Sequence, residues 1–195
     1  MPITIDGTGS ISGVSATGIS AVQDITNASV TPAKLSQPFT SGTAVASTSG
    51  TSIDFTGIPS WVKRVTVMFN GVSTNSTSQV QIQLGSTTFS TSGYSSTSSY
   101  GGNIGQLAFA TTGFITDPAA AAIASITRSG IYQFTLVNSN NWVGSGNIGT
   151  GVNGQVTLAC GGNSPTLGGT LDRVRITTVN GTDTFDAGTI NILYE

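Results

Sequence analysis

The chain has 195 residues, of which 37% are hydrophobic and only 7% are charged, and its 6 Lys and Arg against 8 Asp and Glu give a formal net charge of −2. So few cations exclude a surface that neutralises a nucleic-acid backbone, and because no run of about 18 apolar residues occurs, we expect no membrane insertion. There is no His and a single Cys, Cys160, so zinc sites of Cys and His, the usual catalytic triads and an intrachain disulfide are excluded; we expect no cofactor and no metal.

The first 47 residues differ from the rest of the chain. Single apolar residues such as Ile11, Ile19 and Val30 recur every few positions, with too few large side chains to bury a core. One chain gains little from this spacing, whereas several chains packed around a shared axis could bury these residues together. We therefore predict that residues 1–47 form an extended segment for attachment and oligomerisation; the alternative is an unstructured leader or linker.

From residue 48 onward the patterns are those of β-strands, and residues 57–84 show them most clearly. Apolar residues alternate with polar ones twice, over 64–69 and over 79–84, with turn-forming residues between the two stretches. Period-2 alternation predicts strands with one buried face and one wet face, here joined as a central hairpin. The expected wet side of the second strand consists of Gln79, Gln81 and Gln83.

Further apolar or alternating stretches are separated by turn residues. They cover residues 51–58, 106–115, 125–137, 155–160, 171–179 and 189–194. Two polar segments, 92–102 and 138–151, are predicted to be loops, and Asp117 is placed to cap a short helical turn. About eight strands of this kind predict an all-β fold, an antiparallel jelly-roll-like β-sandwich over residues 48–195, with the C-terminus held in a sheet.

Three stretches resemble bacteriophage tail-fibre and virion structural proteins. Two of them are fairly specific: GIPSWVKR with VMFNGVSTN, within residues 57–75, and the run LDRVRITTVNGTDTFDAGTINILYE over 171–195. The third, ITNASVTPAKL at 25–35, is similar to common linkers ahead of trimeric phage fibre heads. The resemblance covers most of the chain. It implies a homotrimer with a C-terminal β-head, whose residues 1–47 contact other virion tail proteins, located in the virion tail after assembly in the host cytoplasm.

The expected function is a non-enzymatic phage tail fibre, a structural protein that binds a bacterial surface glycan as a homotrimer. One alternative is a head fibre, decoration or adaptor protein of the virion without receptor binding. Another is a glycan depolymerase, because two carboxylates among Asp172, Asp183 and Asp186 could cleave a glycosidic bond. Capping of the adjacent turns explains the same Asp residues without any activity.

The two predicted loops carry the candidate receptor contacts. An aromatic ring beside amide side chains can stack on a sugar face and hydrogen-bond its hydroxyl groups. Packing inside the domain or against a neighbouring subunit is the alternative for each ring. The candidates are Tyr94, Tyr100, Asn140, Asn141 and Trp142.

Two pairs of basic residues complete the set of candidates. Lys63 with Arg64, and Arg173 with Arg175, flank apolar strand positions and could contact an anionic glycan. The alternative is that they form solvated strand faces, paired with Asp54 or Asp172.

Overall fold

The structure, a computed structural model, describes residues 37–100, 107–124, 126–151 and 156–195, and these residues confirm an all-β fold. The predicted linker at 25–35 and the apolar series of the first segment lie outside the described residues. The only helix in the described part is a 3-10 turn, η3 (Ala119–Ala121). The strands are β1 (Thr40–Ser41), β2 (Val45–Ala46), β3 (Ser52–Thr56), β4 (Arg64–Thr74), β5 (Val80–Ser86), β6 (Thr88–Phe89), β7 (Ser95–Tyr100), β8 (Leu107–Ala110), β9 (Phe114–Ile115), β10 (Thr127–Asn138), β11 (Asn141–Gly151), β12 (Thr157–Asn163), β13 (Arg173–Thr178) and β14 (Phe185–Tyr194).

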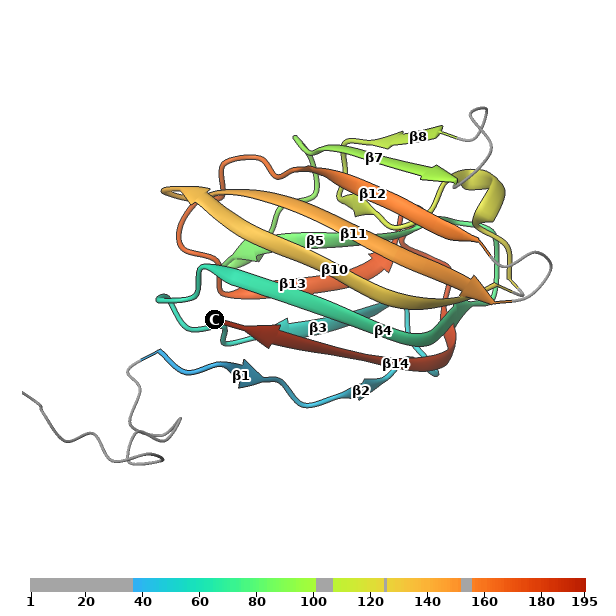
Figure 1. Cartoon of the computed structure of the whole chain (residues 1–195), viewed down its shortest axis with the longest axis horizontal. Helices are drawn as coiled ribbons and strands as arrows, with labels where there is room; N and C mark the ends of the chain where they lie inside the picture. Colours follow the sequence, from blue (N-terminus) through green and yellow to red (C-terminus); the bar gives the residue numbers. More distant parts are fainter. Residues whose placement is uncertain (1–36, 101–106, 125, 152–155) are drawn as a thin grey trace, which may run out of the picture. The chain divides into compact units, whose positions relative to one another are not determined.

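The strands form two antiparallel sheets that lie one over the other (Figure 1). The nine-stranded sheet has the order β1-β14-β4-β10-β11-β12-β7-β8, with β2 also paired to β14. The five-stranded sheet has the order β3-β13-β5-β6, with β9 paired to β5. The core fills the space between the sheets; for example, the Phe114 ring of β9 lies 4.8 Å from the Phe134 ring and 5.7 Å from the Tyr132 ring, both on β10. Aromatic pairs at these distances add to the stabilisation from buried area.

The predicted central hairpin is wrong, because its two strands belong to different sheets. β4 pairs with β10 and β14, whereas β5 pairs with β13 and β9. The segment between them crosses from one sheet to the other, and it is held by a hydrogen bond from the Ser78 backbone N–H to the Asp183 carboxylate at 2.9 Å. Alternation predicts which side of a strand is buried, as it does for Val65 and Val67, but it does not identify the partner strand.

Both segments predicted as polar loops contain strands, β7 and β11. In β11, glycines face the aromatic residues of β10: Gly144 is opposite Phe134, and Gly146 is opposite Tyr132. A Cβ on Gly144 would lie 2.6 Å from the Phe134 ring, so the ring covers the glycine backbone closely. A glycine-rich sequence therefore forms an ordered strand here because the neighbouring aromatic side chains supply the packing that glycine lacks.

A buried ion pair links the segment after β9 to β10. Arg128 and Asp117 have fully buried side chains, and Arg128 donates to the Asp117 carboxylate from Nε at 3.2 Å and from Nη2 at 2.8 Å. The same carboxylate accepts hydrogen bonds from Thr116 Oγ1 at 2.6 Å and from the Val80 backbone N–H at 3.2 Å. The expectation that Asp117 caps a helical turn is wrong, since η3 has no side-chain cap and the carboxylate points into the core.

Both ends of the described chain lie near one edge of the nine-stranded sheet, where β1 pairs with β14. β14 pairs with β4 along most of its length, and Lys63 N–H donates to the Glu195 carbonyl at 2.7 Å, which confirms that the C-terminus is held in a sheet. β1 and β2 pair with the other edge of β14, so part of the segment predicted as extended, residues 1–47, belongs to the sheet.

Candidate functional site

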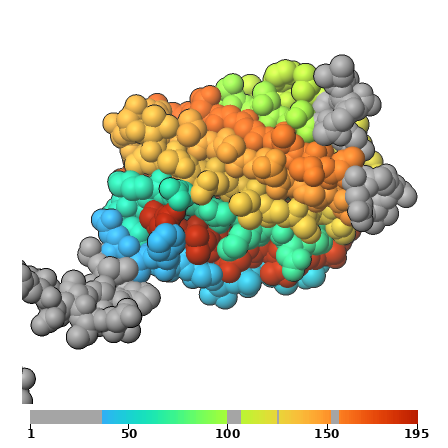
Figure 2. Space-filling model, viewed as in Figure 1, coloured from blue at the N-terminus to red at the C-terminus, as the bar shows by residue number. Residues whose placement is uncertain are grey.

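On the outer face of the nine-stranded sheet, the strands β10, β11, β12, β7 and β8 lie side by side (Figure 2) and carry no exposed charged side chain. We call this surface the neutral face and define it by the outward residues of β10, β11, β12, β7 and β8. The strand registers place these residues in rows across the sheet, and one row runs from β10 to β8. That row consists of Ile131, Asn147, Ala159, Ser99 and Leu107.

The neutral face carries no charge because the strands that form it contain almost no charged residues. The strands β7, β8, β11 and β12 contain no Asp, Glu, Lys or Arg, and the one charged residue of β10 is Arg128, which is buried. Among the Ser, Thr, Asn and Gly of this face stand exposed apolar side chains, including Ile131 and Val143. A face of this composition can approach a second uncharged surface without the cost of removing water from an unpaired charge.

Two shallow hollows lie side by side on the neutral face. One has a volume of about 240 Å³ and is lined by Thr135 and Val143, and the other has a volume of about 370 Å³ and is lined by Ile131 and Ala159. Gln133 and Ser145 line both hollows, so the two form a continuous depression over β10 and β11. The lining offers hydroxyl and amide groups beside aliphatic carbon and contains no ionisable carboxylate or amine.

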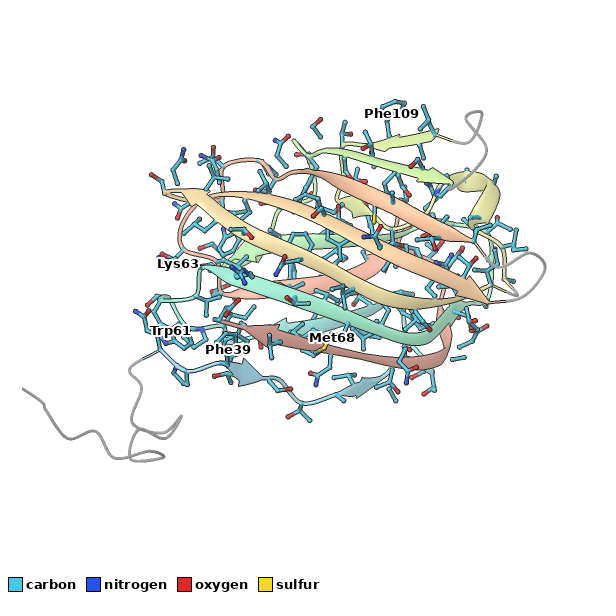
Figure 3. The ribbon with its side chains drawn as sticks, viewed as in Figure 1. Phe39, Trp61, Lys63, Met68 and Phe109 are labelled. Carbon is cyan, nitrogen blue, oxygen red and sulfur yellow. The ribbon has the colours of Figure 1, made fainter. Side chains whose placement is uncertain are left out.

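Exposed aromatic residues mark the two opposite edges of the nine-stranded sheet (Figure 3). Phe109 on the β8 edge strand is 76% exposed, and its neighbour Leu107 is also exposed. Phe39, immediately before β1 at the other edge, is 68% exposed. Single exposed apolar residues are common on proteins, but Phe109 and Leu107 stand on an edge strand whose outer backbone groups pair with no described strand.

Two of the predicted receptor contacts are buried, so the expectation that they bind a ligand is wrong. Trp142 is 1% exposed and lies in the core between the sheets. Tyr94 is 3% exposed; its hydroxyl group accepts from the Leu84 N–H at 2.8 Å and donates toward the Ser90 carbonyl at 3.1 Å. Burial raises the pKa of Tyr94 well above its usual range, which fits a hydroxyl group enclosed in the core.

The remaining predicted contacts do not form a common site. Asn141 lies at the turn between β10 and β11, where its amide donates to Asn138 at 2.8 Å and accepts from Thr166 at 2.7 Å. Asn140, in the same turn, accepts a backbone hydrogen bond from Leu167. The Tyr100 side chain lies outside the described residues. The Asn141 side chain and the Asn140 backbone therefore hold the turn in place, and the structure does not bring either residue to an exposed aromatic ring.

Each carboxylate from residue 54 onward has a protein partner. Three form ion pairs with neighbouring arginines on the surface: Asp54 with Arg175, Asp172 with Arg173, and Glu195 with Arg64. Asp117 pairs with buried Arg128, Asp183 accepts from Asn180 and Ser78, and Asp186 accepts from the Ser73 hydroxyl group. The Asp183 contacts fit the alternative of turn capping, and the ion pairs of Arg173 and Arg175 are those that the alternative of paired strand faces expects.

The residue types and contacts also bear on metal binding and thiol chemistry. In the part of the chain that the structure describes, no three of the Cys, Asp and Glu side chains gather in a way that could hold a metal ion. Cys160 is buried on β12, and burial raises the pKa of its thiol to about 12, so it stays protonated at neutral pH. Within the same residues no helix is long and apolar enough to cross a membrane.

The sequence contains a signal for the neutral face, but two of its strands, β7 and β11, lie in segments that were predicted to be loops. Between residues 118 and 171 the only charged residue is Arg128. Because the strands within that range are neighbours in one sheet, a charge-free sequence becomes a charge-free surface.

Comparisons of this chain with the models of known protein families, with curated protein sequences and with solved structures find no match.

Proposed function

We propose that this protein is a non-enzymatic structural subunit of a bacteriophage tail fibre, which assembles as a homotrimer and binds a bacterial surface glycan through its jelly-roll-like β-head. The observation that carries the proposal is the neutral face, a charge-free and partly apolar surface on a domain whose described carboxylates are paired with other side chains. Such a surface fits a subunit that is buried against copies of itself, and it offers no pair of free carboxylates for glycan cleavage.

The positions of Phe39 and Phe109 fit a cyclic assembly of copies, of which the proposed trimer is one form. In a ring of identical subunits, each copy contacts its two neighbours through two different surfaces. The two edges of the nine-stranded sheet supply two such surfaces, each with an exposed aromatic ring. A subunit interface that covered Phe39 of one copy with the β8 edge of the next would also protect the edge strand from non-specific pairing.

The location of the chain on the virus particle tests the function. Gold-labelled antibody against the chain, applied to purified particles from its native source, should mark the tail. Label on the capsid would replace the proposal with the alternative of a head fibre or decoration protein, which the neutral face would serve equally well. A chain that is absent from purified particles would overturn both.

A further inference from the structure

A polar hollow lies on the outer face of the five-stranded sheet, on the far side of the domain from the neutral face. It has a volume of about 290 Å³ and is lined by residues of β5 and β13 and of the segments beside them. Ligand sites in proteins usually measure about 300 to 1,000 Å³, so this hollow is at the lower end and has room for one small ring. Two of its lining residues, Gln81 and Gln83, were expected on a wet face and are instead almost completely buried.

The buried amides belong to a fixed hydrogen-bond network. Gln81 accepts from Thr112 Oγ1 at 2.8 Å and donates to the Thr178 carbonyl at 3.3 Å, so both ends of its amide are occupied. Gln83 donates to the Thr112 carbonyl at 2.9 Å, and no described residue donates to its amide oxygen. The network holds the Gln83 amide in one position, while its oxygen remains available to accept from a ligand. Because the side chain is already ordered, little conformational entropy is lost when a ligand binds.

The charge at the rim of the hollow is balanced. Arg175 lines the hollow, and its Nε and Nη2 donate to the Asp54 carboxylate at 2.8 and 2.7 Å. The Phe89 ring lies 4.1 Å from the guanidinium carbon and holds the group in place. No described residue accepts from Arg175 Nη1, so this group can still donate to a ligand, while Asp54 cancels its charge. The site therefore combines hydroxyl groups, amides and one neutralised guanidinium.

We infer that this hollow binds one neutral, hydroxyl-rich ring, a monosaccharide unit of a surface glycan. The ligand hydroxyl groups would donate to the Gln83 amide oxygen and accept from Arg175 Nη1, with the exposed Thr91 hydroxyl group at the rim as a third contact. A charged sugar fits less well because Asp54 already satisfies the guanidinium. This inference deepens the receptor-binding part of the proposed function and rests on it.

The test is an NMR titration of the ¹⁵N-labelled full-length protein. The probes are glucose, galactose, mannose, rhamnose, N-acetylglucosamine and N-acetylgalactosamine, each added separately, with glucuronate as the charged counterpart of glucose. We expect at least one neutral sugar to shift the Gln83 side-chain amide resonances and the backbone resonances of β5 and β13, with a millimolar Kd, at concentrations up to about 100 mM.

Matched variants decide whether those shifts report this hollow. Gln83→Met keeps the length of the side chain and removes the acceptor, so it should raise the Kd by at least about fivefold. Thr91 is exposed, so Thr91→Val should leave folding unchanged. It should also raise the Kd, and it can be measured even if Gln83→Met fails to fold. Thr56→Val makes the same chemical change as Thr91→Val at an exposed position of β3 outside the hollow, and it should leave the Kd unchanged.

Three outcomes would overturn the inference: no neutral sugar shifts the resonances of the hollow, only glucuronate does, or Thr56→Val weakens binding as much as the hollow variants. None of them would alter where gold label marks the particle, so the failure of this site is distinguishable from the failure of the proposed tail location.

Discussion

Removing the charge of Asp117 should destabilise the domain more than any single surface change. Asp117→Asn preserves the shape of the side chain, and the new amide oxygen can still accept from Thr116 and Val80. Arg128, however, would lose the hydrogen bond from Nη2 to Oδ2 and the negative charge that compensates its own, while its side chain stays fully buried. Breaking one partner of a buried ion pair usually costs about 3–5 kcal/mol, because the other charge is left without compensation.

The reverse substitution and the double variant separate the pair from its surroundings. Arg128→Met should cost a similar amount, since it leaves the Asp117 carboxylate buried without its cation. The two substitutions together remove both charges, so the double variant should be more stable than the sum of the single effects indicates, with a coupling of about 3 kcal/mol.

Urea unfolding at fixed protein concentration, followed by the fluorescence of Trp61 and of buried Trp142, measures these effects. With an m value of about 2 kcal/mol/M, a loss of 4 kcal/mol lowers the midpoint by about 2 M. If a single variant fails to fold, recovery of folding in the double variant supports the argument. Single losses below about 1 kcal/mol, or strict additivity, would show that the pair does not hold the two sheets together.

Three further predictions test separate parts of the structure. Gly144→Ala should lose about 1–3 kcal/mol of stability in the same assay, because the new Cβ would lie 2.6 Å from the Phe134 ring. In the control Gly149→Ala the nearest atom is 3.5 Å from the new Cβ, so the urea midpoint should not fall. Equal effects of the two variants would contradict the packing argument. The hydrogen bond from Arg173 lowers the pKa of Asp172. The ion pair therefore stabilises the fold at a pH above the pKa of the unfolded carboxyl group, and this contribution is lost as the pH falls through the lower pKa of the folded state. The urea midpoints of the wild type and Asp172→Asn should differ most near neutral pH and converge in acid, and a difference that grows in acid would contradict this sign. Cys160 should react with a thiol reagent at pH 8 at least about 100 times more slowly in the folded protein than in urea, and equal rates would show that the thiol is not protected.

The inward sides of the strands were predictable from the sequence, but the partners of those strands were not. Val65, Val67, Ile82 and Leu84 alternate with polar residues and are buried as the period-2 pattern predicts. Nothing in that pattern distinguishes a hairpin from two strands in opposite sheets, because both place the same residues in the core.

The candidate ligand contacts failed for a related reason. Trp142 stands among Gly, Ser and Asn residues that are typical of loops, and its burial follows from β11 lying beside the aromatic residues of β10. Asp117 precedes a Pro and therefore matches a helix cap locally, but the partner that decides its position, Arg128, is separated from it by a strand boundary. Interactions between distant segments thus determined which polar and aromatic residues remained available for function.

The central proposal is that the full-length chain assembles through the neutral face and the two edges of the nine-stranded sheet, and the mass of the assembly in solution tests it most directly. Light scattering during size-exclusion chromatography should give three times the mass of one 19.6 kDa chain. Phe109→Ser, at the β8 edge, should convert the trimer to monomers, and Val179→Ser, which replaces an exposed apolar residue away from the neutral face, should not. A wild-type protein that remains a monomer at all concentrations, or a Phe109→Ser variant that remains a trimer, would contradict the proposed assembly.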